Sequence, residues 1–206
     1  MKPATEPRLD GVTERRRQVV LAGHAGDVDR ARGGLGDVEP SVRVSALGAL
    51  ERLGALHEDD LRAAFGDPAP AVRRRACELA ATHPGVAVVG ALDDDDSSVA
   101  EMAAWSLGER VERTAVPALV TMASMGTGHS DPLCREAAVA ALGAIGEPSG
   151  LAAVLGALDD KPAIRRRAAV ALAAFEGPSV DAALQRCLED RDWQVRQVAE
   201  DLLAEG

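Results

Sequence analysis

One segment recurs through the chain at a nearly constant interval, and this repetition constrains the fold more than any other feature. Each copy begins with an acidic turn, followed by an apolar residue that we use as the marker of the repeat. An Arg usually follows the marker, and an Ala-rich run comes next. The marker stands at Val42, Val72, Val99, Cys134, Ile164 and Val195. The steps of 30, 27, 35, 30 and 31 residues suit a two-helix unit that buries its apolar face only by stacking on its neighbours.

Each unit is expected to hold a short first helix, a turn and a second helix. Proline is favoured in the first turn of a helix, and it predicts first helices beginning at Pro84, Pro117, Pro148 and Pro178. In the second helix of the first unit, Val42, Ala46, Ala49, Leu50 and Leu53 lie on one helical face. Glycine after such a run predicts a helix end, as at Gly108, Gly143 and Gly146. The pattern predicts about thirteen helices.

The Asp-x-x-x-x-x-Arg spacing and the run Val-Arg-x-x-Ala-x-x-Ala-Leu-Gly resemble the HEAT-repeat family, in particular its short bacterial repeats named after phycobilisome lyase subunits. The resemblance covers residue 26 to the end. It implies an all-α fold, a right-handed α-solenoid of about six two-helix repeats whose second helices line a concave face. The expected division is a tail with an orphan capping helix over residues 1–25 and one solenoid domain over residues 26–206.

Composition agrees with thin, closely packed helices. The chain has two Trp, two Phe and no Tyr, so the bulk that usually fills a globular core is missing. Alanine, which is abundant here, is the best helix former. We therefore expect helices that approach one another closely.

Acidic and basic residues recur in step with the repeat. Four units place an Asp six residues before an Arg, and these pairs are Asp37 and Arg43, Asp67 and Arg73, Asp159 and Arg165, and Asp190 and Arg196. The family resemblance implies that they form a ladder inside the stack. A structural role is favoured over a catalytic one, because parallel copies would not share one pocket. Ala100 replaces the Arg of the third unit and His129 the Asp of the fourth, so the stack is expected to be weaker or specialised there.

Exposed residues of the second helices form the candidate partner surface. Trp105 lies six residues beyond its marker, where other units carry residues as different as Gly48, Glu78 and Asp201. A Trp at such a tolerant position indicates a binding anchor, and the alternative is that it fills a gap between small neighbours. The predicted partner-binding residues are Glu101, Met102, Trp105, Glu136, Arg74, Arg75, Arg166 and Arg167. Pairing of these Arg residues with local acids is the other interpretation.

Other motifs point to structure rather than chemistry. The insertion Ser124 to Asp131, with Gly126 and Gly128, is interpreted as a surface loop, with an anion site at the following helix start as the alternative. The run Asp93 to Asp96 precedes a helix start, where negative charge is favoured. The four His residues show no metal-binding spacing. We predict no catalytic residue, no metal and no cofactor.

The function predicted from the sequence is a non-enzymatic protein–protein interaction scaffold or adaptor. A net charge of -10 argues against nucleic acid as the partner, because such binding depends on cations. The polar start of the chain, Met1 to Arg17, lacks the apolar core of a signal peptide, and no apolar run is long enough for a membrane span. Cys77, Cys134 and Cys187 form no Cys-x-x-Cys pair, which favours a reduced, cytoplasmic protein.

Two alternative functions remain open at this point. One is a HEAT-type nucleic-acid-binding or DNA-glycosylase-like protein, and the other is an accessory subunit of a tetrapyrrole lyase. The sequence does not identify the partner, the pathway or the oligomeric state. It also leaves open whether the Gly126–Gly128 loop or Trp105 is functional.

Overall fold

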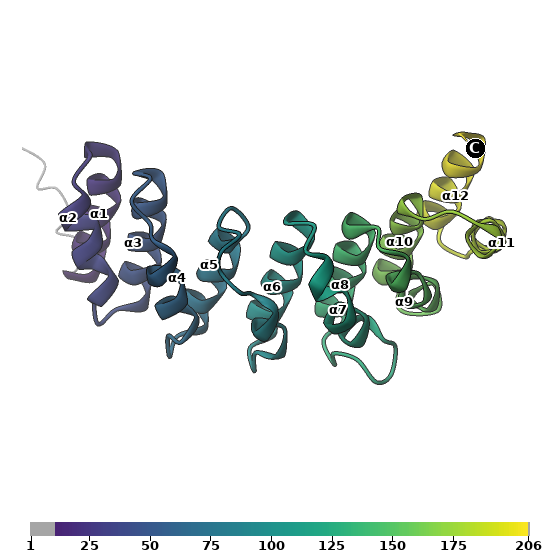
Figure 1. Ribbon diagram of the computed structural model, residues 1–206, viewed down its shortest axis with the longest axis horizontal. Coiled ribbons are helices and arrows are strands. Elements are labelled where there is room, and N and C mark those ends of the chain that lie inside the picture. The colour runs from purple at the N-terminus through teal and green to yellow at the C-terminus, as the bar shows by residue number, and fades with distance from the viewer. Residues whose placement is uncertain (1–10, 206) are drawn as a thin grey trace, which may run out of the picture. The chain divides into compact units, whose positions relative to one another are not determined.

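The computed structural model describes residues 11–205, and within them the regular structure is helical throughout (Figure 1). The start of the expected N-terminal tail, before Gly11, lies outside the described residues. The α-helices are α1 (Gly11–Ala25), α2 (Val28–Gly33), α3 (Pro40–Arg52), α4 (Glu58–Phe65), α5 (Pro70–Ala80), α6 (Ser97–Glu109), α7 (Val116–Ala123), α8 (Pro132–Ile145), α9 (Leu151–Ala157), α10 (Pro162–Ala171), α11 (Pro178–Cys187) and α12 (Trp193–Glu205). The 3₁₀ helices are η1 (Gly34–Gly36), η2 (Val89–Asp93), η3 (Arg113–Ala115), η4 (Pro148–Gly150) and η5 (Leu172–Ala174).

The chain divides into two compact units, one up to Leu79 and one from Ala80 onward. In the first unit α1 packs against α3, and α2 packs against both. In the second unit α6 packs against α8, α8 against α10, and α10 against α12. The second helices of successive repeats therefore stand side by side there (Figure 1). A single solenoid domain beginning at residue 26 stays a prediction.

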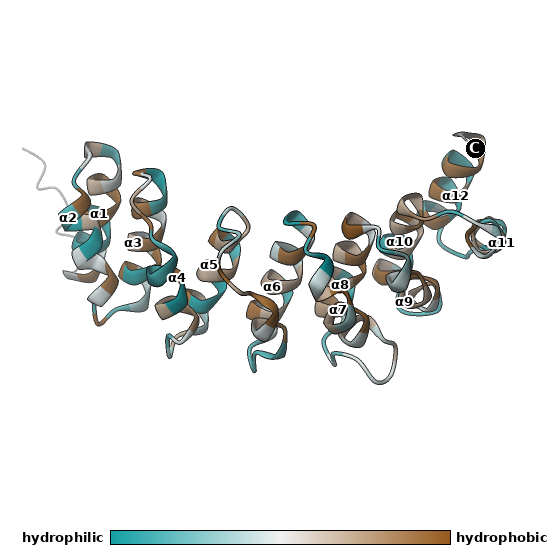
Figure 2. Ribbon diagram, viewed as in Figure 1, coloured by the Kyte–Doolittle hydropathy of each residue, from teal (hydrophilic) through white to brown (hydrophobic). Residues whose placement is uncertain are grey.

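Small aliphatic residues form the core of both units. Ala46, Ala103 and Ala138 are fully buried, as are the leucines of the same helices, Leu50 and Leu107. Figure 2 shows hydrophobic residues distributed over the helices, with a hydrophilic stretch at the start of α4. Because Ala adds little bulk, the helices must approach closely to bury their apolar faces.

Glycine and alanine make the closest contacts between second helices. A Cβ on Gly108 would lie 2.9 Å from the Cα of Ala141, and one on Gly143 would lie 2.6 Å from the Cβ of Ala171. The prediction that Gly143 ends its helix is wrong, because it lies inside α8, whereas α6 does end one residue after Gly108. Both glycines bring their helix backbones close to the next helix. Gly146 does cap α8, with φ of 64°.

The first helix of the third repeat is missing. Pro84 was expected to start a helix, but residues 81–88 form turns and irregular backbone, and only η2 follows. Pro84-Gly85 favours a turn, and the β-branched residues and glycine after it are weak helix formers. The described residues consequently hold twelve α-helices rather than thirteen.

Helix α1 makes the contacts of a second helix, although the sequence suggested an orphan cap. Its Arg15 binds Asp37 as the later ladder Arg residues bind their partners. A Cβ on its Gly23 would lie 2.9 Å from Ala49, which repeats the Gly108–Ala141 contact. The sequence signal was present, since Arg15 precedes Arg43 by nearly one repeat length, but the apolar marker before Arg15 is replaced by Glu14.

Two glycine substitutions test the close packing. Gly143→Ala is expected to lower the free energy of unfolding by about 1–3 kcal/mol, because the new methyl group would overlap Ala171. Gly156→Ala in α9 is the matched control, since a Cβ there meets nothing within 4 Å, and it should raise stability by up to about 1 kcal/mol. Urea denaturation of both variants measures the difference, and a Gly143→Ala protein as stable as the wild type would contradict the contact.

Candidate functional site

An Arg of one repeat holds two turns together. Nε and Nη2 of Arg43 donate to the two carboxylate oxygens of Asp67 in the next repeat, at 2.7 and 2.6 Å. Its Nη1 donates to the main-chain carbonyl of Asp37 in its own repeat, at 2.8 Å. Asp37 and Asp67 also accept from the amide two residues on, as Asp67 does from Ala69 at 2.8 Å. We call each such Arg–Asp ion pair a rung of the ladder. A rung therefore joins the Arg of one repeat to the Asp of the next repeat, and not to the Asp that precedes it by six residues.

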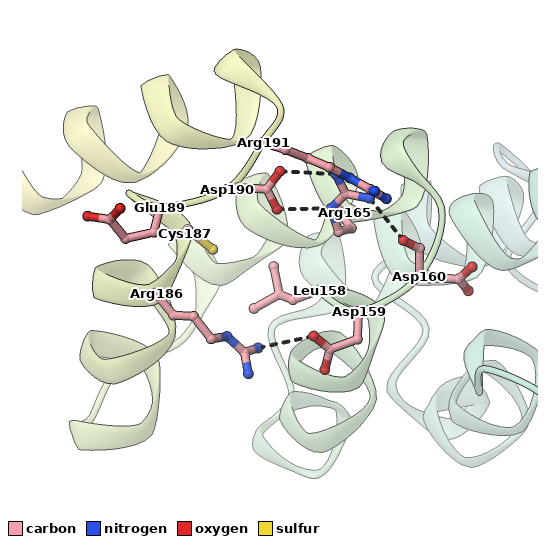
Figure 3. A pocket seen from close by; sticks show the side chains of 9 residues that line it. All are labelled: Leu158, Asp159, Asp160, Arg165, Arg186, Cys187, Glu189, Asp190 and Arg191. Atoms are coloured by element: carbon pink, nitrogen blue, oxygen red, sulfur yellow. Dashed lines mark hydrogen bonds and ion pairs between the residues drawn. The ribbon is translucent and has the colours of Figure 1, made fainter.

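The same arrangement recurs in the second unit. Arg135 donates to both carboxylate oxygens of Asp160, at 2.8 and 3.0 Å. Arg165 binds Asp190 in the same way, at 2.9 and 3.0 Å (Figure 3). In these two rungs both Arg side chains are buried. Arg73 and Arg196 donate to the carbonyls of Asp67 and Asp190 in their own turns, at 2.9 and 2.7 Å.

The prediction that Asp159 belongs to the Asp–Arg ladder is wrong. Its side chain is exposed and lies 4.0 Å from Arg186, while its neighbour Asp160 takes the ladder position. The turn of this repeat is one residue shorter between the ladder Asp and Arg165, so a six-residue spacing selects the wrong acid. Asp160 accepts from the amide of Lys161 instead of the residue two on.

The two irregular repeats together lack one Arg–Asp rung. Because the Arg of one repeat binds the Asp of the next, Ala100 and His129 occupy the two positions that would have formed a single pair. Ala100 is fully buried, and Nδ1 of His129 accepts from the amide of Asp131 at 3.1 Å, as the ladder Asp does elsewhere. The Sγ of Cys134 donates to the Ser97 carbonyl across the same junction, at 3.1 Å.

Hydrogen bonds from Arg keep the ladder acids ionised. The Arg135 and Arg165 guanidinium groups hold the pKa values of Asp160 and Asp190 below the usual range, against the effect of burial. For Asp67, burial acts to raise the pKa, and the bonds from Arg43 and an amide leave it lowered. The pKa values of the three Arg partners are raised by the same bonds. The rungs are thus ion pairs at neutral pH.

Neighbouring acids offer a matched test of the ladder. Asp160→Asn is expected to lower the free energy of unfolding by about 3 kcal/mol, because it leaves the buried Arg135 without its counter-charge. Asp159→Asn removes an exposed carboxylate and should change stability by less than about 0.5 kcal/mol. Thermal and urea unfolding compare the two variants, and equal losses would contradict the register of the ladder.

Acid should weaken the ladder. The ladder acids have lower pKa values in the folded chain, so their contribution is complete above the unfolded carboxyl value of about 3.9 and is lost as pH falls through the lower folded values. The free energy of unfolding is expected to drop as pH decreases from about 5 toward 3. Asp160→Asn should show a shallower drop than the wild type in urea titrations at each pH. If the free energy of unfolding fell equally steeply with pH in both proteins, the Arg135–Asp160 rung would not be the source of the pH dependence.

The second helices of the second unit present an apolar surface. We define the second-helix face as the exposed side of α6, α8 and α10 around Trp105, Ala140 and Val170, which occupy equivalent repeat positions. Trp105 is 42% exposed and Val170 50% exposed. A shallow groove of about 320 Å³ lies between α8 and α10 on this face, and its lining is Ala140, Gly143, Ala144, Arg167, Val170, Ala171, Ala173 and Ala174.

The other residues predicted to bind a partner differ in their surroundings. Glu101, Met102 and Glu136 are half-buried on α6 and α8. Nη2 of Arg167 lies 3.5 Å from Glu136, a loose contact on the groove rim. Nε of Arg166 is held by Asp192 at 2.7 Å.

In the first unit, Nη1 of Arg75 pairs with Glu78 at 2.7 Å. Its guanidinium lies over Gly48, and Arg74 is exposed. The structure thus groups Glu101, Met102, Trp105, Glu136 and Arg167 on the second-helix face, whereas Arg166 is engaged in a turn.

Two other candidate features have structural roles. In the insertion, the amides of Gly128 and His129 donate to the carbonyls of Ser124 and Met122, so the loop closes on itself. The carboxylate of Asp131 accepts from Leu133 and already caps α8, where an anion was considered. Asp96 caps α6 in the same way.

A hollow of about 430 Å³ opens beside the Arg165–Asp190 rung (Figure 3). Four of the charged side chains that line it form two ion pairs, Arg165 with Asp190 and Arg186 with Asp159. Burial raises the pKa of the Cys187 thiol at its edge, which disfavours a reactive thiolate. These two pairs are contacts between successive repeats.

The described residues offer neither a metal site nor a membrane span. Within residues 11–205, no group of three His, Cys, Asp or Glu residues is placed to hold a metal ion. In the same range, every helix is too short or too polar to cross a bilayer.

The profile for HEAT repeats matches residues 86–170 and again residues 127–204, more than half of the chain. The protein belongs to the HEAT-repeat family. This agrees with its helical repeats, its ladder and the all-α solenoid class expected from the sequence. No curated protein sequence matches this HEAT-repeat chain.

Solved structures show the same class of fold. The complex of CpcE and CpcF of phycocyanin lyase from Nostoc sp. PCC7120 has 24% identity and a TM-score of 0.59, over 98% of this chain and 79% of that one. YibA of Escherichia coli has 17% identity and a TM-score of 0.64, over 97% and 77%. A computationally designed armadillo repeat protein for modular peptide recognition has 16% identity and a TM-score of 0.51, over 96% and 94%. At these identities the likeness concerns the fold alone.

Proposed function

We propose that this HEAT-repeat protein is a non-enzymatic scaffold or adaptor that binds a partner protein through the second-helix face. The observation that carries the proposal is Trp105, an aromatic side chain 42% exposed in a chain with one other Trp. Exposed Trp residues are frequent centres of binding energy in protein interfaces. Here the indole stands in a row with Ala140 and Val170 on adjacent helices.

The surroundings of Trp105 support a protein surface as the ligand. The groove between α8 and α10 has an aliphatic lining with a single charged rim residue, Arg167, which suits an apolar side chain of a partner. Met102 adds a flexible apolar side chain one turn from Trp105. Glu101, Glu136 and Arg167 supply the charged rim that makes such a surface selective.

The likeness to complexes is consistent with this role. Among the solved structures, one is a complex of two lyase subunits and another was designed for peptide recognition. Nothing on the second-helix face favours a tetrapyrrole lyase role, and the net charge of -10 disfavours nucleic acid. We place the scaffold in the cytoplasm because its three cysteines are buried and none of them forms a disulfide. Arg74 and Arg75 remain a separate predicted contact on the first unit.

Comparison of the two tryptophans tests this function. The full chain, immobilised, is used to capture proteins from its native host, and each captured protein is then purified and titrated by calorimetry. Trp105→Ala is expected to weaken a specific partner about tenfold or more. Trp193→Ala is the matched control, since Trp193 is also exposed, at the start of α12, and it should leave affinity unchanged. A partner that binds both variants equally well would contradict the proposed surface.

A further inference from the structure

Trp105 is bracketed by carboxylates on its own helix. Glu101 precedes it by four residues and Glu109 follows it by four. Residues four apart lie on the same side of a helix, with Cβ atoms about 5–6 Å apart. Glu109 is exposed and Glu101 half-buried. The two carboxylates therefore flank the exposed indole along the axis of α6.

Neither of these two carboxylates has an ion pair in the part of the chain that the structure describes. Helix α6 itself carries no Lys or Arg. Some other helix acids are paired by a nearby Arg, as Glu58 is by Arg62 at 2.6 Å and Glu78 by Arg75 at 2.7 Å, so a cation within reach is used where the helix offers one. Arg113, the cation four residues after Glu109, lies against Glu147 instead. The Trp105 surface thus presents negative charge with no internal counter-ion.

An exposed indole with two carboxylates suits a cation. A guanidinium or ammonium group over the face of Trp is attracted by the ring, and the flanking carboxylates would neutralise its charge. An arginine fits better than a lysine, because its planar group stacks on an aromatic ring while donating to carboxylates. Charge complementarity also disfavours a second copy of this chain, since each copy carries a net charge of -10.

We propose that Trp105, Glu101 and Glu109 form a receptor for a basic side chain of the partner protein. This inference rests on the proposed function and specifies the partner as a segment rich in positive charge. Glu136, which is held only at 3.5 Å by Arg167, lies on the adjacent helix and adds to the negative potential. The net charge of the chain would attract such a segment from a distance.

The groove sets the spacing of a second contact. Packed helices lie about 8–10 Å apart, so the groove between α8 and α10 is about 14 Å from α6. An extended segment advances about 3.3 Å per residue. A partner segment crossing the helices would therefore place an aliphatic residue in the groove about four positions from the basic residue on Trp105.

A selection experiment tests the specificity. A random displayed-peptide library is selected on the immobilised full chain at low ionic strength, where charge contributes most. The enriched peptides are expected to carry an Arg or Lys with an aliphatic residue about four positions away. Their affinities are measured by fluorescence anisotropy of the labelled peptide. In a Trp193→Phe background, Trp105 is the sole indole, and its emission should change on binding.

Matched charge variants decide between local and general attraction. Glu101→Gln combined with Glu109→Gln is expected to weaken the basic peptides about tenfold. Asp93→Asn combined with Asp95→Asn removes the same charge from exposed positions of the same repeat and should weaken them less than about twofold. Trp105→Leu keeps an apolar side chain but removes the aromatic ring, and it should cost about fivefold.

Three results would overturn the inference. These are an absence of enriched peptides, enrichment of peptides without basic residues, and equal losses in the two double variants. The proposed function is decided separately, by the Trp105→Ala and Trp193→Ala comparison with captured partners. Apolar peptides that depend on Trp105 but not on Glu101 and Glu109 would leave the scaffold role standing while removing the basic-residue receptor.

Discussion

The rung between an Arg of one repeat and an Asp of the next is the interaction on which the rest of this structure depends. Arg43, Arg135 and Arg165 each bind the carboxylate ahead and a carbonyl behind, so one side chain sets the distance between two turns. The second helices begin directly after those turns. A fixed turn spacing keeps these helices close enough for Ala and Gly to fill the space between them, which a core without aromatic bulk requires.

The junction between α6 and α8 shows what happens when a rung is absent. Ala100 and His129 remove both of its members, yet the junction is closed by other means: Gly108 against Ala141, and the Cys134 thiol on the Ser97 carbonyl. The expectation of a specialised stack at this point is thus refined, because the junction keeps a glycine–alanine contact like that between α8 and α10 and has a thiol hydrogen bond where other junctions have an ion pair. The same repeat carries Trp105 and its unpaired acids on the outside.

Much of the fold could be predicted because the constraint is local and repeated. Each marker residue, from Val42 to Val195, indicates the apolar face of a second helix. The spacing from Asp to Arg indicates a turn that precedes this helix. Predictions from the sequence were wrong where the same residue type fits two different structural roles. Gly143 looks like a helix end in sequence, but it lies inside α8 and makes a close contact with the next helix. Asp159 and Asp160 are indistinguishable by composition, and only the reach of Arg135 selects Asp160.

The sequence by itself determined the repeat, its length, the helical class and the residue types that join one repeat to the next, since each of these follows from spacing along one chain. The tertiary structure decided which residues meet. It assigned Arg43, Arg135 and Arg165 to the Asp one repeat ahead. It also gave α1 the contacts of a second helix and separated the engaged Arg166 from Arg167 on the groove rim. Within residues 11–205, it also left Glu101 and Glu109 beside Trp105 without an ion pair. Pairing between repeats depends on distances in space that the order of residues does not contain.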